Sequence, residues 1–302
     1  MTMKSIRIGT RDSELALWQA HTVKNKLEAL GYQTEIVKIK SEGDLILTQP
    51  LYEMGITGIF TKTLDIAMIE GKIDIAVHSM KDVPTSLPRG IVQKAVLQRA
   101  DYQDILVYKE NLDFLQNAAT IATGSLRRKA QWLHKYPTHT VENLRGNVNS
   151  RLQKLRDNNW NGAIFAAAGL ERINKKPDNH IVLDWMIPAP AQGAVVVVVN
   201  EKDAFSCEAV EKLNHAETEI CTHVERQFLK VLEGGCTAPI GALAQFQNDE
   251  IYFEGALFSL DGKEKVSIAK SIKKSDFQNF GKECAEKILN NGGKEIMQKI
   301  VS

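Results

Sequence analysis

Strand-like and helix-like segments alternate from residue 6 onward, and this alternation constrains the fold of the chain more than any other feature. Residues 6–10 have the pattern of a short strand, and residues 13–30 that of a helix with one apolar face that stops at Gly31. Further strands are expected near residues 34–40 and 74–78, with a helix at 59–70. The alternation predicts an α/β fold with a mostly parallel sheet and helices packed on its faces.

The pattern restarts after Gly90 and predicts a second α/β unit. The apolar run at residues 194–199 suits a strand buried on both faces, which can return to the first sheet after a hinge-like stretch at 188–193. The expected elements of the second unit are strands at 105–108, 120–123 and 163–167 and helices at 125–135 and 148–158.

A third, smaller domain is expected at the end of the chain. From about residue 208 a long helical stretch leads into Glu233-Gly234-Gly235-Cys236, and strands such as 251–258 and a C-terminal helix follow. A chain of 302 residues is long enough for three domains. The expected domains are 1–97 together with 194–211, then 101–189, then 216–302.

The overall charge excludes several kinds of partner. The chain has 38 basic and 37 acidic residues, so no global field is available to hold nucleic acid or a membrane surface, and any anion site must be local. The N-terminal residues lack the apolar stretch of a signal peptide, and no segment has the length of a membrane helix. The four cysteines form no C-x-x-C pair, so we expect a cytoplasmic protein without disulfides.

One stretch rich in reactive and charged side chains lies just beyond the carboxyl end of an expected strand, where α/β sheets bind ligands. Its sequence is His78-Ser79-Met80-Lys81-Asp82-Val83-Pro84. Asp82 can transfer protons there, while Lys81 can pair with an anionic group. A surface salt bridge in a proline-bounded loop is the simpler interpretation of these residues alone.

Three other strand–helix junctions are basic. Thr123-Gly124-Ser125-Leu126-Arg127-Arg128 combines a helix N-terminus with two arginines, which favours carboxylate or phosphate binding, although a solvated helix start explains it equally well. Arg145 beside Gly146, with Arg151 six residues later, repeats the pattern. Arg11 and Ser13 form the third junction. Together the junctions predict a basic cleft for a polycarboxylate.

Cys236 lies in a glycine-rich loop that lets another molecule approach closely, so its thiolate can attach a group covalently. A buried structural cysteine is the simpler interpretation from the loop alone. The other cysteines, Cys207, Cys221 and Cys284, lie in helical surroundings and are expected to be structural. No metal site is expected, because Cys221 points away from the helix face that Glu219 and His223 share.

Taken in order, these motifs resemble those of the porphobilinogen deaminases, also called hydroxymethylbilane synthases. The likeness runs from residue 6 to about residue 244 and rests on residues 8–19, 78–84, 124–128, 144–147 and 233–241. It implies a three-domain α/β fold. Domains one and two would resemble type II periplasmic binding proteins with a hinged cleft, and the small α/β domain three would carry the cofactor cysteine.

The resemblance also implies an activity. The family condenses four porphobilinogen molecules head to tail, with loss of ammonia, onto a dipyrromethane cofactor and releases hydroxymethylbilane for haem biosynthesis. Cys236 matches the cysteine that holds this cofactor in thioether linkage, and Asp82 matches the catalytic aspartate. A monomer is expected, with porphobilinogen as its substrate and possible transfer of the product to uroporphyrinogen-III synthase.

The remaining site residues are carried over by position in the motifs. Basic side chains are needed because porphobilinogen carries an acetate and a propionate. The expected cofactor-binding residues are Cys236, Lys81, Asp82, Ser125, Arg127, Arg128, Arg151 and Gly146. The expected substrate-binding residues are Arg11, Ser13, Gln19, Arg145, Arg151, Arg172 and Gln192.

Three positions depart from the family pattern. Thr57 stands where an active-site loop lysine is common, Gly124 replaces a frequent serine, and Ala191 replaces the usual glycine before Gln192. The chief alternative function is a hinged, non-enzymatic anion-binding protein, which would have no need of a thiol at Cys236. A cysteine-dependent acyl transferase is a more distant alternative, since no base for the thiol is identified.

Overall fold

The computed structural model describes residues 4–40, 58, 60–232 and 238–301. Cys236 and Thr57 lie outside the described residues. The chain divides into two compact units, and beyond residue 60 it passes between them after Ala100, after Gln192 and after Glu219. The first unit contains Ile56–Ala100 and Gly193–Glu219 besides the N-terminal segment, and the second contains Asp101–Gln192 and Ile220–Ser302.

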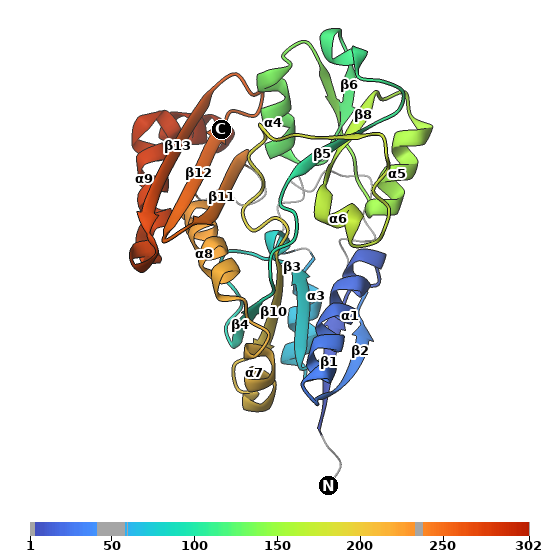
Figure 1. Ribbon diagram of the computed structural model, residues 1–302, viewed down its shortest axis with the longest axis vertical. Coiled ribbons are helices and arrows are strands. Elements are labelled where there is room, and N and C mark those ends of the chain that lie inside the picture. The colour runs from blue at the N-terminus through green and yellow to red at the C-terminus, as the bar shows by residue number, and fades with distance from the viewer. Residues whose placement is uncertain (1–3, 41–57, 59, 233–237, 302) are drawn as a thin grey trace. The chain divides into compact units, whose positions relative to one another are not determined.

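The first unit is built on one five-stranded sheet with the order β2-β1-β3-β10-β4 (Figure 1). β1 pairs in parallel with β2 and β3, whereas β10 is antiparallel to both of its neighbours, so the sheet is mixed rather than mostly parallel. Its strands are β1 (Ser5–Thr10), β2 (Gln33–Lys38), β3 (Ile75–Ser79), β4 (Ile91–Val96) and β10 (Val195–Asn200). The predicted return of the apolar run to the first sheet is confirmed, and β10 is fully buried over Val195–Val199.

Among the residues that the structure describes, the helices that accompany this sheet are α1 (Glu14–Ala29), α3 (Lys62–Ile69) and α7 (Ala204–Glu211). The buried side chains of α1, among them Val23 and Leu27, form one core with Ile6 and Ile8 of β1. Gly31 follows the helix with φ of 88°, a left-handed conformation that glycine adopts without strain. The predicted helix and its stop are therefore confirmed.

The helical stretch predicted from about residue 208 consists of two helices, because the chain leaves the helical conformation between α7 and α8 (Ala216–Val231). In this interval Asn214 Oδ1 accepts a hydrogen bond from Val96 N–H at 2.9 Å, and His215 N–H donates to Val96 O at 2.8 Å. The end of β4 is thus completed by a segment that a continuous helix would have carried past it.

The second unit contains a five-stranded sheet with the order β7-β6-β8-β5-β9. As in the first unit, four strands run in one direction and one, β5, is antiparallel to both of its neighbours. Leu106, Trp132 and Ile164 lie in its core. Its elements are β5 (Asp104–Tyr108), β6 (Thr120–Ala122), α4 (Leu126–Lys135), β7 (Thr140–Glu142), α5 (Val148–Asp157), β8 (Gly162–Ala166), α6 (Ala167–Glu171) and β9 (His180–Val182).

A second sheet of the same unit is an antiparallel meander with its own core. Phe228 of α8, Phe253 and Phe280 meet there edge to face. Its elements are β11 (Ile240–Gln247), β12 (Glu250–Phe258), β13 (Lys265–Lys273), α9 (Phe280–Ile288) and α10 (Lys294–Val301). The α/β fold class is confirmed, while the division into three domains stays a prediction. Within the described part of the chain, no helix has both the length and the apolar character to cross a bilayer.

Candidate functional site

Asp82 is presented to solvent at the carboxyl end of a buried strand. β3 ends at Ser79, and a 3-10 turn, Met80–Asp82, follows at once. Met80 anchors this turn, because its side chain is buried and its N–H donates to Ala194 O at 3.0 Å. Lys81 is half-buried and Asp82 is exposed. The sequence-based placement of both side chains beyond the strand end is confirmed.

His78, in the same strand, is buried and uncharged. Its side chain is 6% exposed, and its Nε2 has no hydrogen-bond partner among the described residues. Burial, assisted by the charge of Arg11, lowers the pKa of His78 to about 4. The ring is therefore neutral at physiological pH, beside a cation of the predicted site.

This depressed pKa predicts a pH-dependent stability. The unfolded chain binds the His78 proton near pH 6.5 and the folded chain only near pH 4, so stability is lost as the pH falls through that window. We expect wild-type protein to lose about 2–3 kcal/mol more than His78→Gln between pH 7 and pH 4.5 in urea titrations. The exposed His21 supplies the control, His21→Gln; equal losses in all three proteins would contradict the assignment.

The first basic junction has structural partners of its own. Ser13 caps α1 by accepting a hydrogen bond from Ala16 N–H at 3.3 Å. Gln19 is buried, and its Nε2 donates to the Ser79 hydroxyl at 2.8 Å, which ties α1 to the end of β3. The guanidinium of Arg11 lies over the ring of Phe60, 4.3 Å from its centroid. Their predicted substrate contacts stay predictions.

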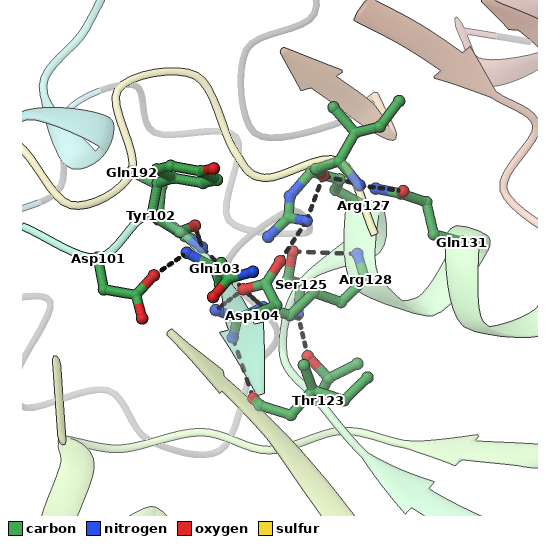
Figure 2. A network of polar contacts seen from close by, with 12 residues as sticks. Asp101, Tyr102, Gln103, Asp104, Thr123, Ser125, Arg127, Arg128, Gln131 and Gln192 are labelled. Atoms are coloured by element: carbon green, nitrogen blue, oxygen red, sulfur yellow. Dashed lines mark hydrogen bonds and ion pairs between the residues drawn. The ribbon is translucent and has the colours of Figure 1, made fainter. Parts of the chain in front are cut away.

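The second basic junction is a buried ion cluster (Figure 2). Ser125 caps α4 by accepting from Arg128 N–H at 3.4 Å, and both arginines of the first helical turn reach the carboxylate of Asp104 on β5. Arg127 and Arg128 are each 5% exposed and Asp104 is fully buried. The arginines therefore do not form the solvated helix start that the sequence left open.

The cluster holds more positive than negative charge. Burial alone would raise the pKa of Asp104, but the charges of Arg127 and Arg128 outweigh it and hold this pKa well below its usual range. Burial lowers the pKa of Arg127 despite its pairing with Asp104. One carboxylate thus faces two guanidinium groups, so these three side chains together carry a net positive charge.

Donors remain available in this cluster. On Arg128, the Nε and Nη2 atoms donate to Asp104 and Nη1 donates to Ile164 O at 3.0 Å. On Arg127 only Nη1 is engaged, by Asp104 and by Ile187 O, and its buried Nε has no hydrogen-bond partner among the described residues. A buried guanidinium with an open edge is suited to a carboxylate ligand.

The third basic junction lies in the same unit. Gly146 has φ of 113°, and a Cβ there would come within 2.9 Å of Ser150 Cβ, so this loop position requires glycine. Arg145, which precedes it, is 4% exposed, and burial lowers its pKa. Burial also lowers the pKa of Arg172, to about 10, while Arg151 is half-buried on α5. Desolvated cations of this kind favour anionic ligands.

The departure at Gly124 has a steric cause. A Cβ at this position would lie 2.5 Å from Leu144 O, so a serine would require the β7–α5 loop to move. The departure at Ala191 carries strain instead. This buried residue has φ of 62°, and its N–H donates to the carboxylate of the equally buried Glu225 at 2.6 Å.

Replacing Ala191 with glycine should stabilise the protein. A left-handed alanine costs about 1–2 kcal/mol relative to glycine. Glycine also raises the entropy of the unfolded chain, and this reduces the gain in stability by about 0.4–1 kcal/mol. We expect a net gain of about 0.5–1 kcal/mol in the free energy of unfolding, measured with denaturant. Ala189→Gly is the control, since Ala189 does not have positive φ and should lose stability. A loss of stability in Ala191→Gly would refute the strain.

Two buried carboxylates of this region were missed at the sequence level. Asp104 opens an apolar strand, which is the only local hint of its role. Glu225 accepts from Ala191 N–H and, at 2.8 Å, from Ala244 N–H. Gln192, predicted to bind substrate, is fully buried, and its Nε2 donates to Asp104 and to Tyr102 O.

The three cysteines that the structure describes are free thiols. Burial raises the pKa of Cys284 to about 11 and also raises that of Cys207. Both thiols are therefore poor nucleophiles, as their predicted structural role requires. Across the described ranges, no group of three or more His, Cys, Asp or Glu side chains is placed to hold a metal ion.

Fold and site together define an α/β protein with a buried, arginine-rich ion cluster and an exposed aspartate at a strand end. The family model described as "Porphobilinogen deaminase, dipyromethane cofactor binding domain" matches residues 6–208, and "Porphobilinogen deaminase, C-terminal domain" matches 219–290. The chain belongs to the porphobilinogen deaminase family. The predicted family is thus confirmed.

Curated relatives agree over nearly the whole chain. The porphobilinogen deaminase of Pelotomaculum thermopropionicum is 41% identical, covering 98% of this chain and 97% of its own. That of Trichlorobacter lovleyi is also 41% identical, over 99% and 98% of the two chains. That of Moorella thermoacetica is 40% identical, over 99% and 97%.

Solved structures similar to this chain include an ancestral cationic amino acid solute-binding protein, with a TM-score of 0.44 and 15% identity. The likeness covers 69% of this chain and 87% of that one. A probable amino-acid transporter binding protein from Bacillus subtilis gives a TM-score of 0.41 at 13% identity, over 70% and 90%.

Proposed function

We propose that this chain is a transferase that joins four porphobilinogen molecules head to tail, with release of ammonia, to give hydroxymethylbilane. Its membership of the family confirms the sequence-based prediction of an enzyme of tetrapyrrole biosynthesis. The structural observation that best supports the proposal is the buried surplus of positive charge around Arg127 and Arg128, since every porphobilinogen unit brings two carboxylates.

The dipyrromethane cofactor fits the residues of the second unit. Its carboxylates would complete the charge balance of the Asp104 cluster and use the open edge of Arg127. When bound, the cofactor supplies the pyrrole to which the first substrate is joined. Cys236, outside the described residues, would hold it in thioether linkage. The residues proposed to surround it are Lys81, Asp82, Ser125, Arg127, Arg128, Arg151 and Gly146.

Asp82 is proposed to act in proton transfer. An exposed carboxylate at a strand end can accept pyrrole N–H hydrogen bonds, offset positive charge that develops on the reacting groups and take up the proton lost from the newly linked ring. Met80 fixes the turn that carries Asp82, so the carboxylate has a defined position without being buried. Its exposure leaves room for a substrate.

Substrate carboxylates are proposed to meet the remaining arginines. Arg145 and Arg172 are desolvated, which strengthens their interaction with an incoming anion. Ser13 and Gln192 already make structural hydrogen bonds, so a contact of either with the substrate would be additional to these bonds. The full proposed set is Arg11, Ser13, Gln19, Arg145, Arg151, Arg172 and Gln192.

We also propose a cytoplasmic monomer that passes its product to uroporphyrinogen-III synthase. The free thiols of Cys207, Cys221 and Cys284 support a reducing compartment. The function is tested by incubating purified protein with porphobilinogen and measuring ammonia and linear tetrapyrrole. Four molecules consumed per tetrapyrrole released is the expected result, and consumption without a tetrapyrrole would contradict it.

A further inference from the structure

Asp104 is the common acceptor of the buried ion cluster (Figure 2). Its Oδ2 accepts from Arg127 Nη1 at 2.7 Å. Its Oδ1 accepts from Arg128 Nε and Nη2 at 2.9 and 2.7 Å and from Gln192 Nε2 at 2.9 Å. Such a carboxylate is saturated by protein donors and fully buried, so it does not itself meet a ligand.

Asp104 also lies near a point where the chain passes between the two units. It lies four residues after Ala100, where the chain enters the second unit, and Gln192 lies where the chain leaves it. The Gln192 side chain bonds to Tyr102 O at 2.8 Å as well as to Asp104. The segment around Asp104 that enters the second unit and the segment that ends at Gln192 are thus joined to each other and to the arginines through one carboxylate.

The effect on the arginines is orientation. Two fixed points hold each guanidinium: Asp104 and Ile187 O for Arg127, and Asp104 and Ile164 O for Arg128. With these donors used, the Arg127 donors that have no partner among the described residues are Nε and Nη2, on one edge of the group. Without Asp104, two buried cations would repel each other and take other rotamers.

We propose that Asp104 is a positioning residue for the anion-binding arginines of this enzyme, and that Gln192 holds Asp104 in place. The inference rests on the proposed function for the identity of the anion, the carboxylates of the pyrrole chain. It assigns Gln192 a role within the protein in addition to the substrate contact expected from its sequence position.

A buried ion cluster can also serve stability alone, so the test needs a matched control. Asp74 supplies it, because this buried carboxylate of the first unit accepts from Arg7 Nε, Nη2 and N–H at 3.0, 2.7 and 2.8 Å. Asp74→Asn and Asp104→Asn each remove the charge from a buried acid that holds arginine. Of these two acids, Asp104 contacts Arg127 and Arg128 of the candidate site, whereas Asp74 contacts Arg7.

The experiment uses full-length protein produced in cells that make no porphobilinogen. Folding is checked by near-ultraviolet circular dichroism and thermal melting, porphobilinogen is then added, and the pyrrole adduct is followed by intact-protein mass. We expect Asp104→Asn to load at least tenfold more slowly than Asp74→Asn at a similar loss in melting temperature. Gln192→Leu should load and turn over, with KM for porphobilinogen raised about three- to tenfold and kcat within twofold.

The possible outcomes separate the two claims. Wild-type protein that gains no adduct contradicts the proposed function and, with it, this inference. If wild-type protein loads, and a folded Asp104→Asn loads as fast as Asp74→Asn, the inference is contradicted while the proposed function stands. If Asp104→Asn does not fold, Gln192→Leu decides, and an unchanged KM in that variant overturns the positioning role.

Discussion

Cys236→Ser should be purified without any pyrrole adduct and should form hydroxymethylbilane at a rate below detection. The wild-type protein should exceed the mass of its polypeptide by two linked pyrrole units. The reason is chemical, because a thiolate at neutral pH is a far better nucleophile than a serine hydroxyl and forms a stable thioether.

A cysteine elsewhere in the chain provides the control for this prediction. Cys207 is half-buried on α7, and burial raises the pKa of its thiol, so Cys207→Ser should keep both the adduct and the activity. Intact-protein mass and porphobilinogen consumption are measured on the same samples. An unmodified mass in fully active wild-type protein would refute covalent attachment, and an adduct retained by Cys236→Ser would place it on another residue.

Much of the site was predictable because its signals are local. A capping serine followed by arginines marks the start of α4 at Ser125, and the structure confirms both the cap and the helix. The run of valines in β10 showed a strand buried on both faces for the same reason, since a single short segment carries the whole pattern. Local chemistry of this kind needs no knowledge of the fold.

The ion cluster was not predictable in the same way. Asp104 is separated from Arg127 by a loop and two further elements, and only the pairing of β5 with β8 brings this acid to α4. The antiparallel orientation of β5 in its sheet also could not be derived from the strand pattern, because the direction of a strand within a sheet depends on long-range connections. Burial then changed the interpretation of Arg127 and Arg128 from a solvated helix start to a charged core.

The break between α7 and α8 shows the same limit. Residues around Asn214 and His215 continue a helical pattern, but their hydrogen bonds with Val96 of a strand distant in sequence outweigh local propensity. The strain at Ala191 is likewise invisible in the sequence. Only the backbone angle explains why the family pattern has glycine there.

Asp82→Asn should retain the fold and lower kcat for porphobilinogen by a factor of about 10² to 10⁴. The side chain is exposed, so an amide of the same shape should change stability by less than about 0.5 kcal/mol. The amide cannot accept a proton and offers no charge to the reacting pyrroles, whereas carboxylate binding by the arginines is untouched. KM should therefore change much less than kcat.

Asp113 is a matched control for this variant, since it too is an exposed aspartate in a 3-10 turn. Asp113→Asn should turn over porphobilinogen at the wild-type rate. Initial rates at saturating substrate, together with the mass of each purified protein, separate lost chemistry from lost cofactor. Near-normal kcat in cofactor-loaded Asp82→Asn would show that Asp82 does not take part in the proton transfers, because the amide cannot accept a proton.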